Sequence, residues 1–158
     1  MHQPHSAFGQ HYDLVARVRD LIKEFGYATP TVEPDPTTGT PAFTYTIGLR
    51  LHTAHDGYEL VTAGLPADLA GSIIQRTVEC LAAQNIIPSH GLILPQIAGE
   101  YSVRLHRARN CDWFINGMRT LATPADPEVW QILVPDKHGV FPGDTDYPAD
   151  QLRAQPLL

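Results

Sequence analysis

The chain of 158 residues contains very little cysteine, and Cys80 and Cys111 are its only two thiols. Two cysteines do not make the disulfide framework on which small secreted domains depend, and a chain of this length can bury a core without one. Cys80 lies in an apolar helical pattern, which is typical of a cysteine that packs as a small hydrophobic side chain. The sequence therefore predicts a fold that its hydrophobic core holds together.

Long apolar runs are also missing. No stretch approaches the roughly 20 apolar residues that a membrane-spanning helix needs. The first residues, MHQPHSAFGQHYD, have neither the basic region nor the apolar region of a secretory signal peptide. We therefore expect a soluble, cytoplasmic protein without a membrane partner, and a flexible N-terminal segment over residues 1–10.

Positive charge is scarce as well. The chain has 11 Lys and Arg residues against 17 Asp and Glu residues, which gives a formal net charge of −6. A general nucleic-acid binder needs a basic footprint to displace counterions, and the densest basic group here is only Arg104, Arg107 and Arg109. We therefore expect no nucleic-acid partner, while a local phosphate site stays open.

Short catalytic signatures are absent too. The sequence contains no phosphate-binding loop, no dinucleotide-binding glycine pattern, no Gly-x-Ser-x-Gly, no His-Glu-x-x-His and no Cys-x-x-Cys. These absences lower the expectation of nucleotide-dependent and serine-hydrolase chemistry. They do not exclude enzymes that carry no short signature.

The composition that is present is that of a globular domain, with 43% hydrophobic and 18% charged residues. Apolar residues recur at helical spacing over residues 12–25, where Gly26 offers a stop, and over residues 67–84, where Pro66 opens the helix. Residues 111–122 are interpreted as a short helix. Alternating or β-branched runs predict strands. The expected strands cover residues 27–32, 42–49, 58–64, 91–95, 101–108 and 129–134.

Hairpin-like connections dominate this order, and no glycine-rich turn leads from a strand into a helix. Asp56 and Gly57 supply turn chemistry between the second and third strands, which are therefore expected to pair as antiparallel neighbours. We predict an α+β fold with a mainly antiparallel sheet and two main helices packed on one face. Residues 1–158 are expected to form a single domain, in which a tail over residues 143–158 wraps the surface.

His52 and His55 form a His-x-x-His pair in the loop between two strands. On a helix this spacing places two imidazoles on one face, as a metal site requires, whereas here it falls on a loop, and His90 and His106 are the residues that could complete a site in three dimensions. The alternative interpretation is that the pair consists of surface histidines. A metal site at His52 and His55 is therefore one of two open readings of this loop.

The run RNCDWF is the second candidate for chemistry. Cys111 would begin a short helix, whose N-terminus lowers the pKa of a thiol, and His106 could act as its base. Asp112 opposes thiolate formation, and the alternative is a helix start with Trp113 packed inward. No oxyanion-hole motif accompanies the run.

Arg104 and His106 alternate on one face of a predicted strand. Planar guanidinium groups bind carboxylates and phosphates well, so an anion site there is one hypothesis and a solvated sheet face is the other. If a pocket exists on this face, we expect it to be lined by five side chains. These are Tyr45, Arg104, His106, Cys111 and Trp113.

Four linked motifs carry a resemblance to a known family. The sequence contains PAFTYTIGL, then YELVTAGLP, then a long helix, and finally QILVPDKHGVFP with AQPLL near its end. In this order and over about residues 25–158, it resembles a family of small bacterial proteins defined by a domain of unknown function. The chain has Phe25-Gly26-Tyr27 where that family usually has His-Gly-Trp, and Gly57-Tyr58 where it tends to have His-Pro.

The resemblance implies a shared fold and no established activity. A looser likeness of the strand, Gly-Leu-Pro and helix order to suppressor-of-fused-like immunity proteins implies a protein partner. Our leading hypothesis is a small binding or interaction module that meets a protein partner through its acidic surface. The alternative hypothesis is an enzyme or small-molecule-binding protein with the pocket named above. The cofactor is unknown and the oligomeric state stays open.

Overall fold

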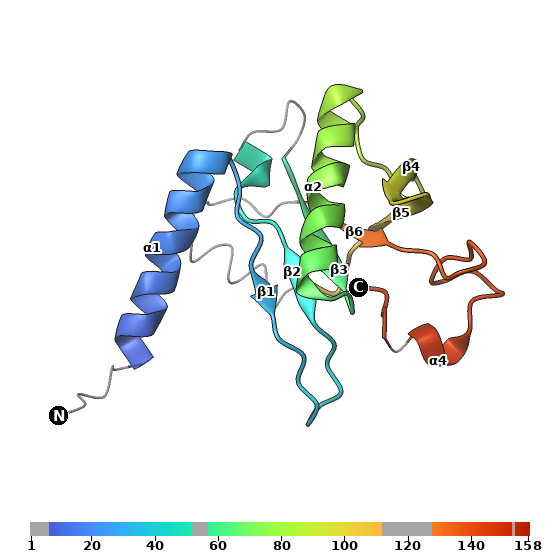
Figure 1. Ribbon diagram of the computed structural model, residues 1–158, viewed down its shortest axis with the longest axis horizontal. Helices are drawn as coiled ribbons and strands as arrows, with labels where there is room; N and C mark the ends of the chain where they lie inside the picture. The colour runs from blue at the N-terminus through green and yellow to red at the C-terminus, as the bar shows by residue number, and fades with distance from the viewer. Residues whose placement is uncertain (1–6, 52–56, 112–127, 153) are drawn as a thin grey trace.

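The computed structural model describes residues 7–51, 57–111, 128–152 and 154–158. Figure 1 shows α1 standing at one end of the molecule, with the sheet beside it and α2 lying along the sheet. No described helix combines the length and the apolar character that a membrane span requires. The elements in chain order are α1 (Ala7–Phe25), β1 (Thr31–Val32), β2 (Phe43–Tyr45), the 3₁₀ helix η1 (Leu49–Leu51), β3 (Tyr58–Ala63), α2 (Ala67–Ala83), β4 (Ile93–Ala98), β5 (Tyr101–Arg107), β6 (Glu128–Leu133) and α4 (Ala149–Leu152).

Six strands form one mixed sheet in the order β1-β2-β3-β6-β5-β4. The α+β class is confirmed, and β2 pairs antiparallel with β3 as expected. The mainly antiparallel sheet that we predicted is a mixed one, because β6 enters between β3 and β5 and runs parallel to β3. A strand that returns to the centre of a sheet has a partner set by tertiary structure, which hairpin spacing cannot reveal.

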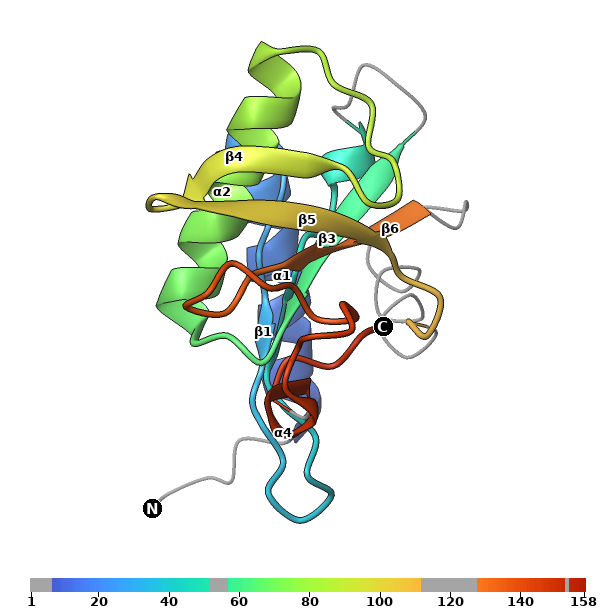
Figure 2. The ribbon, with the colours of Figure 1, turned by 90° about the vertical axis from the view of Figure 1, so that its right-hand side faces the viewer.

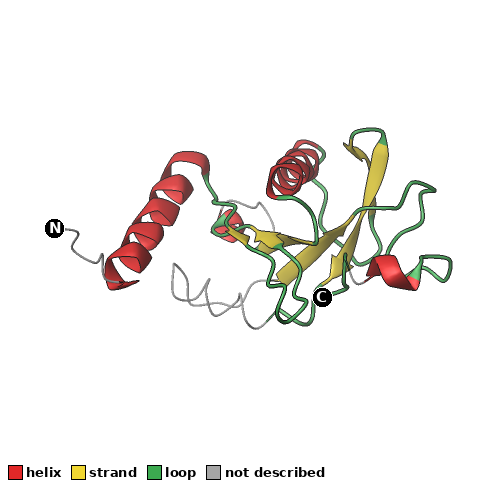
Figure 3. Ribbon diagram, turned by 60° about the horizontal axis from the view of Figure 1, so that its bottom comes forward, coloured by secondary structure: helices red, strands yellow, loops and turns green. Residues whose placement is uncertain are grey.

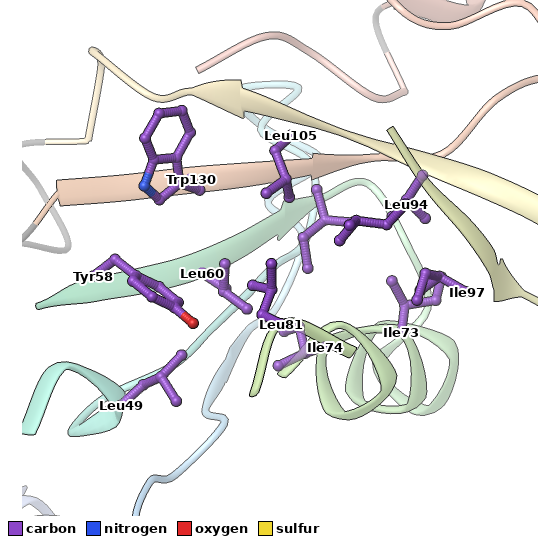
Figure 4. Packing of buried hydrophobic residues seen from close by; sticks show 12 residues of the cluster. Leu49, Tyr58, Leu60, Ile73, Ile74, Leu81, Leu94, Ile97, Leu105 and Trp130 are labelled. Atoms are coloured by element: carbon purple, nitrogen blue, oxygen red, sulfur yellow. The ribbon is translucent and has the colours of Figure 1, made fainter. Parts of the chain in front are cut away.

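One face of the sheet packs against α2 and holds the larger hydrophobic core. Figure 4 shows Leu60 of β3 and Leu105 of β5 among the side chains that meet Ile74 and Leu81 of α2. Leu60, Ile74 and Leu105 are fully buried. Each such side chain stabilises the fold by about 1.5–3 kcal/mol relative to an exposed one. The helix predicted over residues 67–84 is confirmed.

The opposite face holds a second, smaller cluster. Val61 of β3 and Val129 of β6 alternate with the side chains that face α2, and they join Ile47, Ala28 and the α1 residue Val18. Thus α1 and α2 belong to different clusters, and the expected packing of both helices on one face is not confirmed. Because both faces of β3 are covered, all six of its residues are buried.

Four expected elements have other bounds than predicted. The strand expected over residues 27–32 is only β1, Thr31–Val32, and the strand expected over residues 91–95 is β4, Ile93–Ala98. The strand expected over residues 42–49 is regular only from Phe43 to Tyr45, because Gly48 adopts a left-handed φ of +96° and the chain then enters η1. The helix expected to begin at residue 12 begins at Ala7. The short helix expected over residues 111–122 lies almost wholly outside the described residues.

The chain after β6 crosses the sheet face opposite α2 (Figure 3). The side-chain amide of Gln131 donates to the carbonyl of Pro156 at 2.7 Å, and its oxygen accepts the N–H of Leu158 at 2.8 Å. The amide of Gln155 makes the reciprocal pair with both backbone groups of Val134, at 2.8 and 2.9 Å. Two buried side-chain amides therefore satisfy backbone groups of the tail and of Val134, the residue after β6.

Candidate functional site

A buried carboxylate links β3 to the chain that follows β2 on the α1 side of the sheet. Glu59 of β3 is 0% exposed. The hydroxyl of Thr46 donates to Oε2 of Glu59, and the backbone N–H of Gly48 donates to Oε1 at 3.0 Å. The same Thr46 hydroxyl accepts the N–H of Leu60 at 2.9 Å. We call Thr46, Gly48 and Glu59 the carboxylate clasp.

Local sequence explains why the clasp forms. The chain after β2 must turn toward Glu59, and Gly48 permits this with its positive φ. A Cβ on Gly48 would come within 2.9 Å of Ile22 on α1, so the absent side chain also admits the helix. The Tyr-Thr-Ile-Gly-Leu and Glu-Leu motifs therefore meet in space and fix α1 beside them.

Our reading of the sequence did not select Glu59 as a site residue. The available signal was a single acidic residue inside an otherwise uncharged strand, YELVTA, because such a residue is buried only with partners. The pKa of the neighbouring Tyr58 hydroxyl is raised, mainly by burial and in addition by the negative charge of Glu59. A fixed, buried carboxylate can accept hydrogen bonds or hold a cationic group in a defined direction.

Tyr45 and Cys111, two members of the predicted pocket, both belong to the region of the second hydrophobic cluster. Tyr45 packs against the second cluster, and Cys111 is one of its buried members, 4% exposed. Burial raises the pKa of the Tyr45 hydroxyl. The Cys111 sulphur lies 4.0 Å from the carbonyl of Ala108. Trp113, the fifth predicted member, lies outside the described residues.

Arg104 projects toward the chain after β6. Its Nη1 lies 2.6 Å from Oδ1 of Asp144, and its guanidinium stacks over the ring of Phe141 at 4.4 Å. The hydrogen bond from Arg104, followed by that from the N–H of Phe141, lowers the pKa of the Asp144 carboxyl. Arg104 therefore holds the chain after β6 against the sheet.

His106 lies beside the last residue of the chain. Its Nε2 is 3.3 Å from the oxygen of Leu158, and its ring centroid is 5.1 Å from that of His90. Burial is the largest influence and lowers the pKa of His106; His90 and Arg109 lower it further, while the bond to Leu158 opposes them. His90 in turn accepts the N–H of Arg107 at 3.1 Å through Nδ1. His106 is thus joined to the tail rather than left on an open face.

The predicted metal site stays a prediction. His52 and His55 lie outside the described residues, and the described ones contain no group of three or more His, Cys, Asp or Glu side chains placed to hold a metal ion. His90 and His106 lie together, but no third ligand joins them within that part of the chain.

A groove lies on the other side of the molecule, which sequence reasoning did not predict. It has a volume of about 480 Å³ and is formed by α2, the β4–β5 hairpin and the chain that leaves β6. Figure 2 shows the β4–β5 turn beside α2. Its described lining is Leu69, Ser72, Ile73, Arg76, Ile97, Ala98, Gly99, Tyr101, Val134, Pro135 and Lys137.

Comparison with known proteins places the chain in a family. A family model described as a domain of unknown function, DUF4262, matches residues 21–148. The comparisons with curated proteins and with solved structures each find no match. The expected membership of a family of unknown function is confirmed, and the looser likeness to immunity proteins stays a prediction.

Proposed function

Since the chain belongs to the DUF4262 family, whose description assigns no activity, we propose from its own residues that it is a small binding module. We place it in the bacterial cytoplasm and expect no membrane or nucleic-acid partner. Its ligand is a small molecule in the groove beside α2, and its acidic surface is left for a protein partner. The net charge of −6 supports the expected absence of nucleic-acid and membrane partners, because it repels polyanions and anionic membrane surfaces.

The groove beside α2 is the observation that carries this proposal. Its volume of about 480 Å³ falls in the range of small-molecule sites, roughly 300–1,000 Å³. Its lining is mostly apolar with a few polar groups, which is the usual composition of such sites. Leu69 and Tyr101, on either side, are 46% and 47% exposed. A ligand that covers this apolar surface removes it from water and so stabilises the folded protein.

The other face supports binding over catalysis. Arg104 pairs with Asp144, His106 meets Leu158, and Cys111 is almost fully buried. A buried thiol among apolar side chains is inert compared with one in a polar, accessible setting. These three side chains therefore contribute to packing and to the docking of the tail.

Native mass spectrometry of protein purified without a chelator tests the binding proposal, followed by a thermal-shift screen of small molecules. We expect a ligand that stabilises the wild type and fails to stabilise Ser72→Phe, because the new ring fills the groove from α2. Gln75→Phe is the matched control, since Gln75 is exposed on the same helix and is not part of the lining. Equal stabilisation of Ser72→Phe and wild type would contradict the groove as the binding site.

A second candidate is an enzyme or small-molecule binder that uses Tyr45, Arg104, His106, Cys111 and Trp113. The contact of Tyr45 and Cys111 with one cluster favours it. In a Cys80→Ser background, a nucleophilic Cys111 would be alkylated by iodoacetamide faster than a free thiol in denatured protein. Alkylation slower than in denatured protein would exclude Cys111 as the nucleophile.

A further inference from the structure

We propose that the groove beside α2 binds a small amphipathic anion, whose carboxylate or phosphate lies at Arg76 and Lys137 and whose apolar body lies along the groove. This inference rests on the proposed binding function at the same groove and specifies its ligand class. Organic carboxylates and phosphate monoesters share the required chemistry, which is an anionic head on a chain or ring.

The charged side chains around the groove favour an anionic ligand. Arg76 and Lys137 both line it, and among the described lining residues none is acidic. Neither cation forms an ion pair within the part of the chain that the structure describes. Two cations without a carboxylate partner stand out in a chain of net charge −6, and they attract an anion where apolar walls lower the local dielectric.

The acidic residues nearest in sequence do not neutralise them. Glu79 is three residues from Arg76 on α2, but it is not part of the lining, and its Oε1 accepts a hydrogen bond from Nε2 of Gln75 at 3.2 Å. Asp68, Glu100 and Asp136 are also next to or near lining residues without being part of the lining. Oδ1 of Asp136 accepts the N–H groups of His138 and Val140, both at 2.9 Å, so this carboxylate is used within its own loop. The positive charge therefore stays available to a ligand.

A bulge in β4 fixes the position of Arg76. The register of β4 against β5 shifts between Leu94 and Ala98, and Gln96 has a φ of +55°. Residues at a bulge do not take part in the regular hydrogen bonds between strands. The carbonyl of Ile97 instead accepts a hydrogen bond from Nη1 of Arg76 at 3.3 Å. This contact occupies one nitrogen of a guanidinium that has five N–H donors. Arg76 is thus held at the groove, and its remaining N–H groups can donate hydrogen bonds to a ligand.

The apolar side chains of the groove favour a ligand that also has an apolar body. Ile73 and Ile97 are buried beneath the groove, while Leu69 and Tyr101 are exposed at its sides. A chain or ring that covers these side chains removes their apolar surface from water, which favours binding. Neither an inorganic anion nor an uncharged hydrocarbon would use both parts of the lining.

Isothermal titration calorimetry with four probes of equal chain length tests the inference: octanoate, octyl phosphate, octan-1-ol and octylamine. We expect octanoate or octyl phosphate to bind at least about tenfold more tightly than octanol and octylamine, because a charge-assisted hydrogen bond contributes that much. The ratio between the two anions distinguishes a carboxylate ligand from a phosphate ligand. The double variant Arg76→Gln/Lys137→Gln should lose this preference.

Arg19→Gln/Lys23→Gln is the matched control, because it removes two exposed cations of α1 that are distant from the lining. It should keep the affinity of wild type for the anions. Equal binding of all four probes, or full affinity in the Arg76→Gln/Lys137→Gln variant, would overturn the anionic ligand and leave the groove as a binding site. If no probe binds wild type while another ligand stabilises it and not Ser72→Phe, the ligand class is wrong and the proposed function stands. If no probe binds and every ligand from the thermal-shift screen stabilises Ser72→Phe as much as wild type, both the anionic ligand class and the groove as a binding site are wrong.

Discussion

Gly64 lies directly against the carbonyl of Ala154, so closely that a Cβ on Gly64 would fall 1.5 Å from that oxygen. Gly64 also has a φ of +77°, which side-chain-bearing residues rarely adopt. The glycine of the Gly-Leu-Pro motif is therefore required twice, once for the turn between β3 and α2 and once for the passage of the tail. A turn and a chain segment some 90 residues apart thus share one position.

Gly64→Ala should destabilise the protein and displace the tail. The positive φ alone costs about 1–2 kcal/mol, and the carbonyl of Ala154 must move in addition. Urea unfolding measures the first effect, and proteolysis of the chain after β6 measures the second. Gly39→Ala is the control, because Gly39 has a φ of +72° with nothing within 4 Å of an added Cβ. Equal losses for the two variants would contradict the close contact with Ala154.

Thr46→Val should weaken the carboxylate clasp. The valine cannot donate to Glu59 and cannot accept the N–H of Leu60, so two buried groups lose a partner at a cost of about 2–3 kcal/mol. Thr62→Val is the matched control, since Thr62 is similarly buried and its hydroxyl donates only a long hydrogen bond, at 3.5 Å, to the carbonyl of Thr44. Chemical denaturation compares the two. If Thr62→Val costs as much as Thr46→Val, the clasp contributes nothing specific.

Gln131→Leu should release the last residues of the chain. It removes both the bond to the carbonyl of Pro156 and the bond from the N–H of Leu158, with an expected loss of about 1–3 kcal/mol. Hydrogen exchange followed by mass spectrometry should show faster exchange in the C-terminal peptide. Gln75→Leu, at an exposed position of α2, should leave that exchange unchanged. Unchanged exchange in Gln131→Leu would show that the amide does not hold the tail.

His106 should make stability fall as the pH drops below about 6.5. Burial holds its pKa below the ordinary value of 6.5, so between that value and the lower folded pKa the unfolded chain binds a proton that the folded chain does not. Stability therefore rises with pH through this window, and above it His106 contributes no pH dependence. Denaturation of wild type and His106→Gln over this window should show a shallower slope for the variant.

His138→Gln serves as the control for the removal of one imidazole, since His138 is exposed in a loop. Identical slopes for wild type and His106→Gln would mean that the folded protein does not oppose protonation of His106. NMR titration of the imidazole signals then gives a second, independent measure of the same pKa.

The sequence pattern predicted on which strand face the site residues lie, but not which distant residues they contact. The alternation of Arg104 and His106 on one strand face was read correctly from a period of two, but their partners Asp144 and Leu158 lie 40 and 52 residues away. No local pattern gives such pairings. Glu59 was missed because its partners Thr46 and Gly48 lie 13 and 11 residues earlier, in the chain that follows β2, and only strand pairing brings them beside it.

The sequence by itself determined the local elements. The apolar period defined α2, the alternating runs defined the positions of β3, β5 and β6, and glycines marked where the chain turns. These features depend on neighbours within a few residues, so they can be read directly from the order of the residues.

Only the tertiary structure decided the rest. It placed β6 parallel to β3, brought the tail against Gly64, and set Arg76 and Lys137 around one groove. Each of these depends on contacts between segments far apart in the chain, and burial of the two sheet faces selects them together. The sequence contains the residues for these contacts, but which ones meet is fixed only when the whole sheet forms.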